Sequence, residues 1–213
     1  MSGLSKRWEA KNETPLSTKL KESVRPPGAL KPRLESAVRR IEIQVQKMDQ
    51  TSNRFSERDR SIFNRVVDAY EKHDMMRAHV FANELAEIRK MEQMILHAKL
   101  ALEQIVLRLK TVTELGDVAV ALAPVIGVVQ NIKRAMSTVS PEAEKELTDI
   151  GELLSGIVWD AGSITGSSIN FDTVNEDSQK ILSEAATVAE QRMKTKFPEL
   201  PTIDEKVGEA IRP

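Results

Sequence analysis

Residues 64–84 read NRVVDAYEKHDMMRAHVFANE, and within this stretch one apolar stripe of the sequence ends and another begins out of register with it. Lys72, His73 and Asp74 lie at the junction, and Asp is a residue that often caps the start of a helix. A change of register marks either a local irregularity in a coiled coil or a reversal of the chain. Because a reversal would let each stripe bury the other, the stretch predicts a helical hairpin that turns at residues 72–74.

The stripe before the junction keeps a 4-3 spacing that is typical of coiled coils, and only Ser52 and Asp59 interrupt it. Its apolar members are Leu34, Val38, Ile41, Val45, Met48, Phe55, Ile62, Val66 and Ala69, and those of the second stripe are Phe81, Leu85, Ile88, Met91, Ile95, Ala98, Leu102, Ile105, Leu109 and Val112. No Gly or Pro occurs in residues 33–115. We therefore predict an all-α fold built on a long antiparallel hairpin of residues 33–71 and 74–115. A turn in the polar residues 49–53 is an alternative that the pattern leaves open.

The sequence changes character after residue 115. An apolar stretch, DVAVALAPVIGVVQNIKRAM (residues 117–136), predicts a third helix, which either extends the hairpin or folds away from it. Gly116, Pro124 and Gly127 weaken a helical ladder, so we predict a conformational joint there. The most apolar window, residues 118–129, is too short for a bilayer, and we expect no membrane span.

Shorter helices and a flexible C-terminal tail are predicted to follow the core. Ser140, Pro141 and Glu142 have the residue types of a helix start, and that helix should end near Gly162. Residues 162–172, GSITGSSINFD, are typical of a linker, and a final amphipathic helix should cover about residues 173–196. We divide the chain into a basic N-terminal arm (1–32), a helical core (33–139), a regulatory helix with its linker (140–170) and a C-terminal helix with its tail (171–213).

Charge is distributed unevenly along the chain. Residues 1–40 hold ten Lys or Arg against four Glu, whereas residues 140–213 hold seven basic against fifteen acidic side chains. Such a basic front can attract the acidic back or an anionic surface. Within the arm, Leu4, Lys6, Arg7, Trp8 and Lys11 would form a short basic amphipathic helix suited to a membrane interface, the alternative being an unstructured tail that contains a Trp.

The sequence contains no recognisable motif of a catalytic site. The chain has no Cys, which excludes disulfides, thiolate metal sites and a Cys nucleophile. His73, His79 and His97 lack the spacing of metal ligands, and GSITGSS (residues 162–168) lacks the Lys of a phosphate loop. We therefore predict that the protein is not an enzyme and binds no cofactor or metal. The absence of Cys, and of an apolar stretch after the start, indicates an intracellular protein.

The hairpin region resembles the core of archaeal cell-division proteins of the ESCRT-III family. The resemblance is carried by a pattern of spaced positions, RD…F…VV.A…D..RA…ANE.AEIRK. In this sequence those positions are Arg58, Asp59, Phe63, Val66, Val67, Ala69, Asp74, Arg77, Ala78, Ala82, Asn83, Glu84, Ala86, Glu87, Ile88, Arg89 and Lys90. The architecture is similar over residues 30–213, and the pattern supports the turn at Asp74. The chain resembles a shorter paralogue, without the C-terminal winged helix of some relatives.

The resemblance implies a membrane-remodelling filament subunit. Members of this family are closed monomers that open by merging the second and third helices, polymerise with themselves and with paralogues on the cell membrane, and constrict or cut it. An AAA+ ATPase of the Vps-four class removes subunits, and binds a proline-bearing tail peptide through its MIT domain. The resemblance assigns that role to Phe197, Pro198, Leu200, Pro201 and Ile203, although Asp204 stands where a second proline is usual. The expected location is the inner face of the cell membrane at the division site.

Two rival hypotheses come from other functional classes. A structural coiled-coil adaptor would form a fixed dimer and would not bind membranes. A nucleic-acid-associated helical protein would use the basic residues 1–40, and its binding would depend steeply on salt. The arm lacks interleaved aromatic residues and the whole chain has a net charge of −1, so we expect no nucleic-acid partner.

Overall fold

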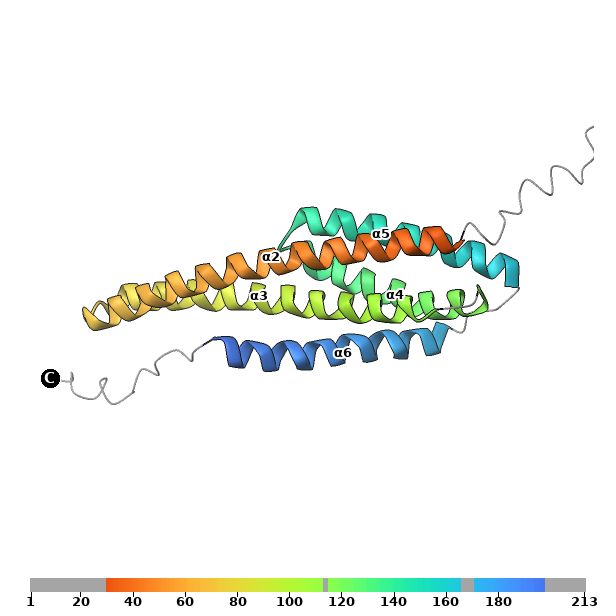
Figure 1. Cartoon of the computed structure of the whole chain (residues 1–213). Helices are drawn as coiled ribbons and strands as arrows, with labels where there is room; N and C mark the ends of the chain where they lie inside the picture. The colour runs from red at the N-terminus through yellow and green to blue at the C-terminus, as the bar shows by residue number, and fades with distance from the viewer. Residues whose placement is uncertain (1–29, 113–114, 166–170, 198–213) are drawn as a thin grey trace, which may run out of the picture.

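The computed structural model describes residues 30–112, 115–165 and 171–197, and every regular element in these ranges is a helix. The helices are α2 (Leu30–Glu71), α3 (Met75–Lys110), α4 (Leu115–Met136), α5 (Pro141–Thr165) and α6 (Phe171–Lys196). Helices α2 and α3 form a long rod, α5 packs along α2 and α4, and α6 packs along α3 and α4 (Figure 1). The predicted all-α class and long hairpin are confirmed.

The hairpin turns at Lys72, His73 and Asp74, as predicted, and residues 49–53 lie inside the uninterrupted α2. His73 adopts the left-handed conformation with φ 57°. The Asp74 N–H donates to the Ala69 carbonyl (2.9 Å) and the His73 N–H donates to the Tyr70 carbonyl (3.0 Å), which is the hydrogen-bond pattern of a Schellman motif. The Asp74 side chain then accepts a hydrogen bond from the Arg77 N–H and caps α3. One short turn thus ends α2 and starts α3.

The chain reverses again between α3 and α4, about five residues earlier than the predicted end of the second hairpin helix. Thr111 is the C-cap of α3, and it begins the sequence Thr-Val-Thr, whose β-branched side chains lower helix propensity. Helix α4 folds back beside α3 instead of extending it (Figure 1). Gly116, Pro124 and Gly127 all lie within α4, and their role as a conformational joint stays a prediction.

Helix α4 is apolar and long enough to cross a membrane over Val118–Met136, in contrast to the expectation from the shorter window. Half of that span is buried inside the protein. Ala119, Leu122, Val125 and Val128 are fully buried in the core that α4 shares with its neighbours. Its composition therefore also suits the central helix of a bundle.

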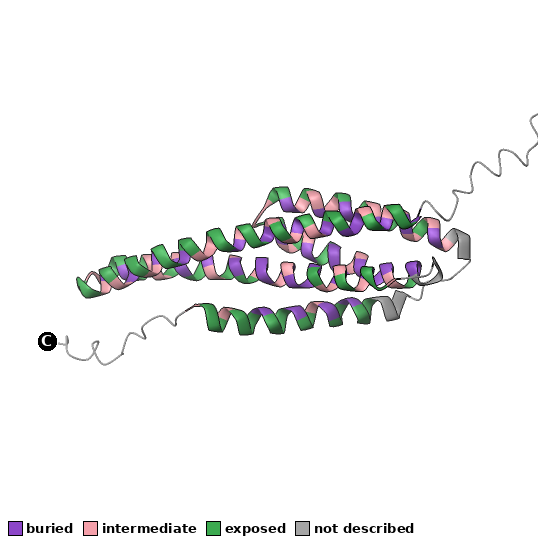
Figure 2. Ribbon diagram, viewed as in Figure 1, coloured by how far each residue is buried: buried purple, intermediate pink, exposed green. Residues whose placement is uncertain are grey.

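Helix α5 begins at Pro141, as predicted, and the Ser140 hydroxyl accepts a hydrogen bond from the Ala143 N–H. It continues to Thr165, so the linker before α6 is shorter than the predicted residues 162–172. Buried residues line the inner sides of the helices, whereas the outer sides are exposed (Figure 2).

Two apolar clusters fill the interior. The larger one joins all five described helices, and the smaller one, formed around Ile62, Val66, Leu85 and Ile88, fills the hairpin near its turn. Between them lie buried polar residues, among them Ser52 and Asp59, the two interruptions of the first apolar stripe. The hairpin is therefore divided by a polar layer, and α6 ends beside this layer.

Candidate functional site: the α6 dock

The polar layer pairs each interruption in α2 with a charged residue of α3. The Ser52 and Ser56 hydroxyls donate to Glu92 Oε1 at 3.3 and 3.0 Å. Arg89 Nε donates to Asp59 Oδ1 at 2.7 Å. Asp59 and Glu92 are almost completely buried, so each carboxylate requires these partners to offset its loss of water.

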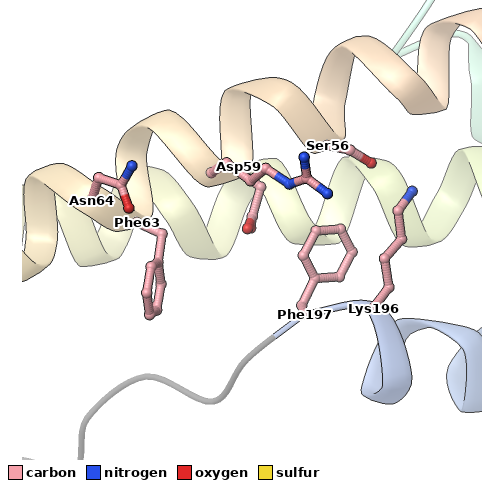
Figure 3. A pocket seen from close by; sticks show the side chains of 7 residues that line it. Ser56, Asp59, Phe63, Asn64, Lys196 and Phe197 are labelled. Carbon is pink, nitrogen blue, oxygen red and sulfur yellow. The ribbon is translucent and has the colours of Figure 1, made fainter.

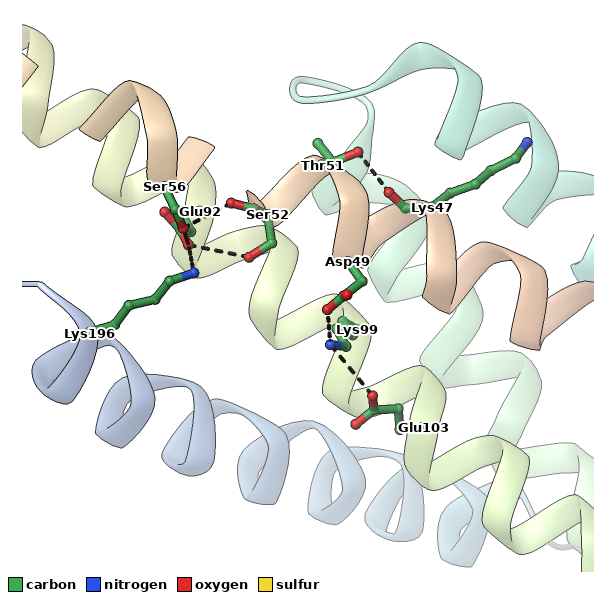
Figure 4. Close-up of polar contacts among 9 residues, drawn as sticks. All are labelled: Lys47, Asp49, Thr51, Ser52, Ser56, Glu92, Lys99, Glu103 and Lys196. Atoms are coloured by element: carbon green, nitrogen blue, oxygen red, sulfur yellow. Dashed lines mark hydrogen bonds and ion pairs between the residues drawn. The ribbon is translucent and has the colours of Figure 1, made fainter. Parts of the chain in front are cut away.

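The end of α6 adds a cation to this layer. Lys196 Nζ lies 2.6 Å from Glu92 Oε1 (Figure 4). Glu92 Oε2 is buried and has no hydrogen-bond partner within the described part of the chain, so this carboxylate is only partly satisfied. Lys196 is the one ion-pair partner of Glu92 among the described residues, and it belongs to a helix that follows the core in sequence. Undocking α6 would therefore leave a buried carboxylate without its cation.

Phe197 follows Lys196 and covers the second pair of the layer. The Arg89 guanidinium lies 5.3 Å from the centroid of the Phe197 ring and 6.0 Å from that of Phe63, within range of a cation–π contact with each. Phe197 forms one wall of a cavity of about 290 Å³ on the hairpin (Figure 3). The other lining residues are Ser56, Asp59, Arg60, Phe63, Asn64 and Lys196.

A second set of contacts holds the first half of α6. The Ser178 hydroxyl is buried and donates to the Pro124 carbonyl of α4 at 2.8 Å. A Cβ at Gly127 would lie 2.8 Å from the Ser178 oxygen, closer than real Cβ contacts, so the helices can approach this closely because residue 127 is a glycine. His97 Nε2 of α3 is 2.9 Å from the Leu182 carbonyl, which it can reach as a donor.

Together these contacts define the α6 dock, which has two parts. One is the Lys196–Phe197 end of α6 on the hairpin, and the other is the notch at Gly127 of α4 that receives Ser178. Within residues 175–196 of α6, the buried apolar side chains are Ile181, Ala185 and Ala189, and Leu182 and Met193 pack against the same core. Other contacts are exposed, such as Arg108 with Asp177 at 3.1 Å. Within α6, the hydrogen bond between Glu190 and Lys194 lowers the pKa of the carboxyl and raises that of the ammonium. Specific polar contacts thus add to the apolar packing of α6 at both parts of the dock.

The structure describes few of the residues that the sequence suggested for binding. Lys72, His73 and Asp74 form the turn, and Phe197 packs against the hairpin. The membrane-binding residues and the rest of the tail motif lie outside the described residues: Leu4, Lys6, Arg7, Trp8, Lys11, Pro198, Leu200, Pro201 and Ile203. Among the described residues, no group of His, Asp or Glu is arranged to hold a metal.

Sequence reasoning missed the dock itself. Ser52 and Asp59 were visible as interruptions, but their partners Arg89 and Glu92 lie 30 or more residues away on α3. The available signal was the family pattern, which contains Asp59 and Arg89 and also the exposed ion pair between Arg58 and Glu84. Lys196 and Ser178 had no signal in a single sequence, because their role depends on how α6 is placed.

Comparison with known proteins identifies relatives of the whole core. The chain is 46% identical over 172 residues to Cell division protein B1 of Sulfolobus acidocaldarius, covering 81% of this chain and 80% of that protein. It is 30% identical over 162 residues to Cell division protein B of the same organism, covering 76% of this chain and 62% of that protein. No family model and no solved structure matches the chain. The chain belongs to the archaeal ESCRT-III family of cell division proteins that includes these two relatives.

Proposed function

We propose that the protein is a subunit of a membrane-remodelling filament in archaeal cell division. The structural observation that supports this is the α6 dock, which would give the chain a closed form with a releasable helix. The proposed site of action is the inner face of the cell membrane at the division site, and the proposed partners are further copies of the chain, its paralogues and an anionic membrane surface. A AAA+ ATPase of the Vps-four class would disassemble the filament.

Release of α6 is the proposed opening step. The hairpin keeps its own apolar seam without α6, because α2 and α3 bury one another along both apolar clusters. Undocking exposes Glu92, the Phe63–Arg89 surface and the α4 face around Gly127 at the same time. These surfaces then become available for contacts between subunits, while α3 and α4 are free to straighten at residues 111–114.

Electron microscopy and flotation with anionic vesicles test the proposal. We expect lipid-supported filaments of the full chain, and weaker flotation for Trp8→Ala or after removal of residues 1–29, because the arm supplies the basic and aromatic membrane contacts. His79→Ala, at an exposed position near the hairpin turn, serves as the control and should float like the parent. A fixed dimer without filaments, with or without vesicles, would instead favour the coiled-coil adaptor.

Binding to the ATPase is tested separately by calorimetry with its MIT domain. The double substitution Leu200→Asp with Ile203→Asp should abolish binding, because the extended proline-bearing segment would lose the side chains that fill apolar pockets. The control is Glu205→Gln with Glu209→Gln, which changes charge downstream of the motif. Equal affinity of the Leu200/Ile203 variant and the parent would place the ATPase site elsewhere.

A further inference from the structure

The outer face of α5 is acidic and carries an exposed tryptophan. We define this face as Lys145, Asp149, Glu152 and Trp159, which recur at helical spacing and are all exposed, Trp159 to 79%. The opposite side of α5 is buried against the bundle through residues such as Leu147, Ile150 and Leu154. A large aromatic side chain on a solvent-facing helix surface that also carries charge is the composition of a docking surface.

The charge of α5 is only partly neutralised within the described residues. The helix has six acidic residues and one Lys, and two of its carboxylates pair with α2: Glu142 with Lys47 at 3.0 Å, and Asp160 with Arg33. The Glu142 hydrogen bond raises the pKa of the Lys47 ammonium. Asp149 and Glu152 form no ion pair with any described cation, and with Lys145 counted the outer face has a net charge of −1.

We propose that the N-terminal arm, residues 1–29, binds along this outer face of α5 in the same molecule. Charge complementarity is the first argument. The arm carries six Lys or Arg against three Glu, and it also contains the apolar Leu4 and Trp8. Its basic side chains would pair with Asp149 and Glu152 while its apolar side chains pack on Trp159.

The point of attachment is the second argument. Helix α2 begins at Leu30, and Arg33 in its first turn reaches across Gly156 of α5 to Asp160. The arm is therefore tethered next to Trp159 and has a high effective concentration at this face. The 25 residues of α5 extend about 37 Å, and a 29-residue chain can span roughly 95 Å when extended. The arm is long enough to reach every acidic residue of the face.

Docking of the arm would keep it from other anionic surfaces. This consequence, unlike the docking itself, rests on the proposed membrane function: an anionic vesicle would compete with α5 for the same basic residues. The closed protein would then be protected from premature membrane binding by a contact that is independent of the α6 dock, since α5 and α6 lie on different sides of the hairpin (Figure 1).

The two tryptophans of the chain, Trp8 and Trp159, allow a direct test. Trp8→Phe leaves Trp159 as the sole indole, and its quenching by acrylamide is compared between the full chain and a version lacking residues 1–25. We expect a roughly twofold lower quenching constant in the full chain, because a covered indole excludes the quencher. Raised salt should remove most of the difference by screening.

A charge reversal supplies the matched control. Asp149→Lys with Glu152→Lys should raise quenching of Trp159 to the value of the truncated chain. Glu176→Lys with Glu184→Lys, an equal charge change at exposed positions of α6, should leave the protection intact. Equal quenching in the full and truncated chains would overturn the proposal, and so would protection that grows with protein concentration, because the arm would then come from a second copy.

Vesicles separate this inference from the proposed function. Adding anionic vesicles to the protected Trp8→Phe chain should release the arm and raise quenching of Trp159. If Trp159 is protected from acrylamide but vesicles do not alter that protection, the docking of the arm is supported and its proposed role in membrane binding is contradicted.

Discussion

Replacing Arg89 with Ala is expected to lower the free energy of unfolding by about 3–5 kcal/mol, the usual cost of leaving a buried charge without its partner. Asp59 is 2% exposed and would lose its 2.7 Å ion pair, while Phe63 and Phe197 would lose their contacts with the guanidinium. Urea denaturation followed by circular dichroism measures the change.

Two controls show whether the loss comes from the buried charge. Arg58→Ala removes the cation of the exposed pair with Glu84, and should cost at most about 1 kcal/mol, as surface pairs do. Asp59→Leu combined with Arg89→Leu removes both charges and should recover most of the stability, since a well-packed apolar pair can replace a buried ion pair. A loss for Arg89→Ala that is no larger than that for Arg58→Ala would show that water reaches Asp59.

The hairpin was predictable because its determinants are local or periodic. The phase change between the two apolar stripes located the turn, and Asp74 identified the start of α3. The left-handed conformation of His73 could not be predicted from the sequence. The end of α3 lies before the predicted one for a physical reason: no Gly or Pro marks it, whereas the β-branched Thr111 and Val112 lower helix propensity there.

The dock could not be predicted, because it depends on contacts between residues that are far apart in the chain. In the sequence, Ser52 and Asp59 are only interruptions of an apolar stripe. Their role becomes clear once the structure places Glu92 and Arg89 opposite them. Gly127 suggested flexibility, yet in this structure it provides the space for Ser178. The sequence presents the tail motif and the helix before it as separate segments, whereas the structure places Phe197 at the junction of the two, against the hairpin.

Gly127→Val is expected to release α6 without altering any residue of α6 itself. The new side chain would collide with Ser178, and overpacking of this kind typically costs about 1–3 kcal/mol. If the dock holds the closed state, assembly should begin at a roughly tenfold lower protein concentration, the change that 1.4 kcal/mol produces. Sedimentation measures assembly, and hydrogen exchange along α6 measures release directly.

The controls separate release from assembly. Gly162→Val, where a Cβ meets nothing within 4 Å, should leave both readouts unchanged. Adding Ser178→Ala to Gly127→Val should restore slow exchange of α6 only in part, because it removes the oxygen that collides but also its hydrogen bond to the Pro124 carbonyl. Deletion of residues 171–213 sets the upper limit of assembly, and the longer deletion of residues 140–213 should likewise assemble spontaneously. Fast exchange of α6 in Gly127→Val, with no assembly of this variant or of either deletion, would keep the dock as a structural element but remove it as the control of polymerisation. Unchanged exchange in Gly127→Val would mean that the notch tolerates a larger residue and is not what holds α6 in place.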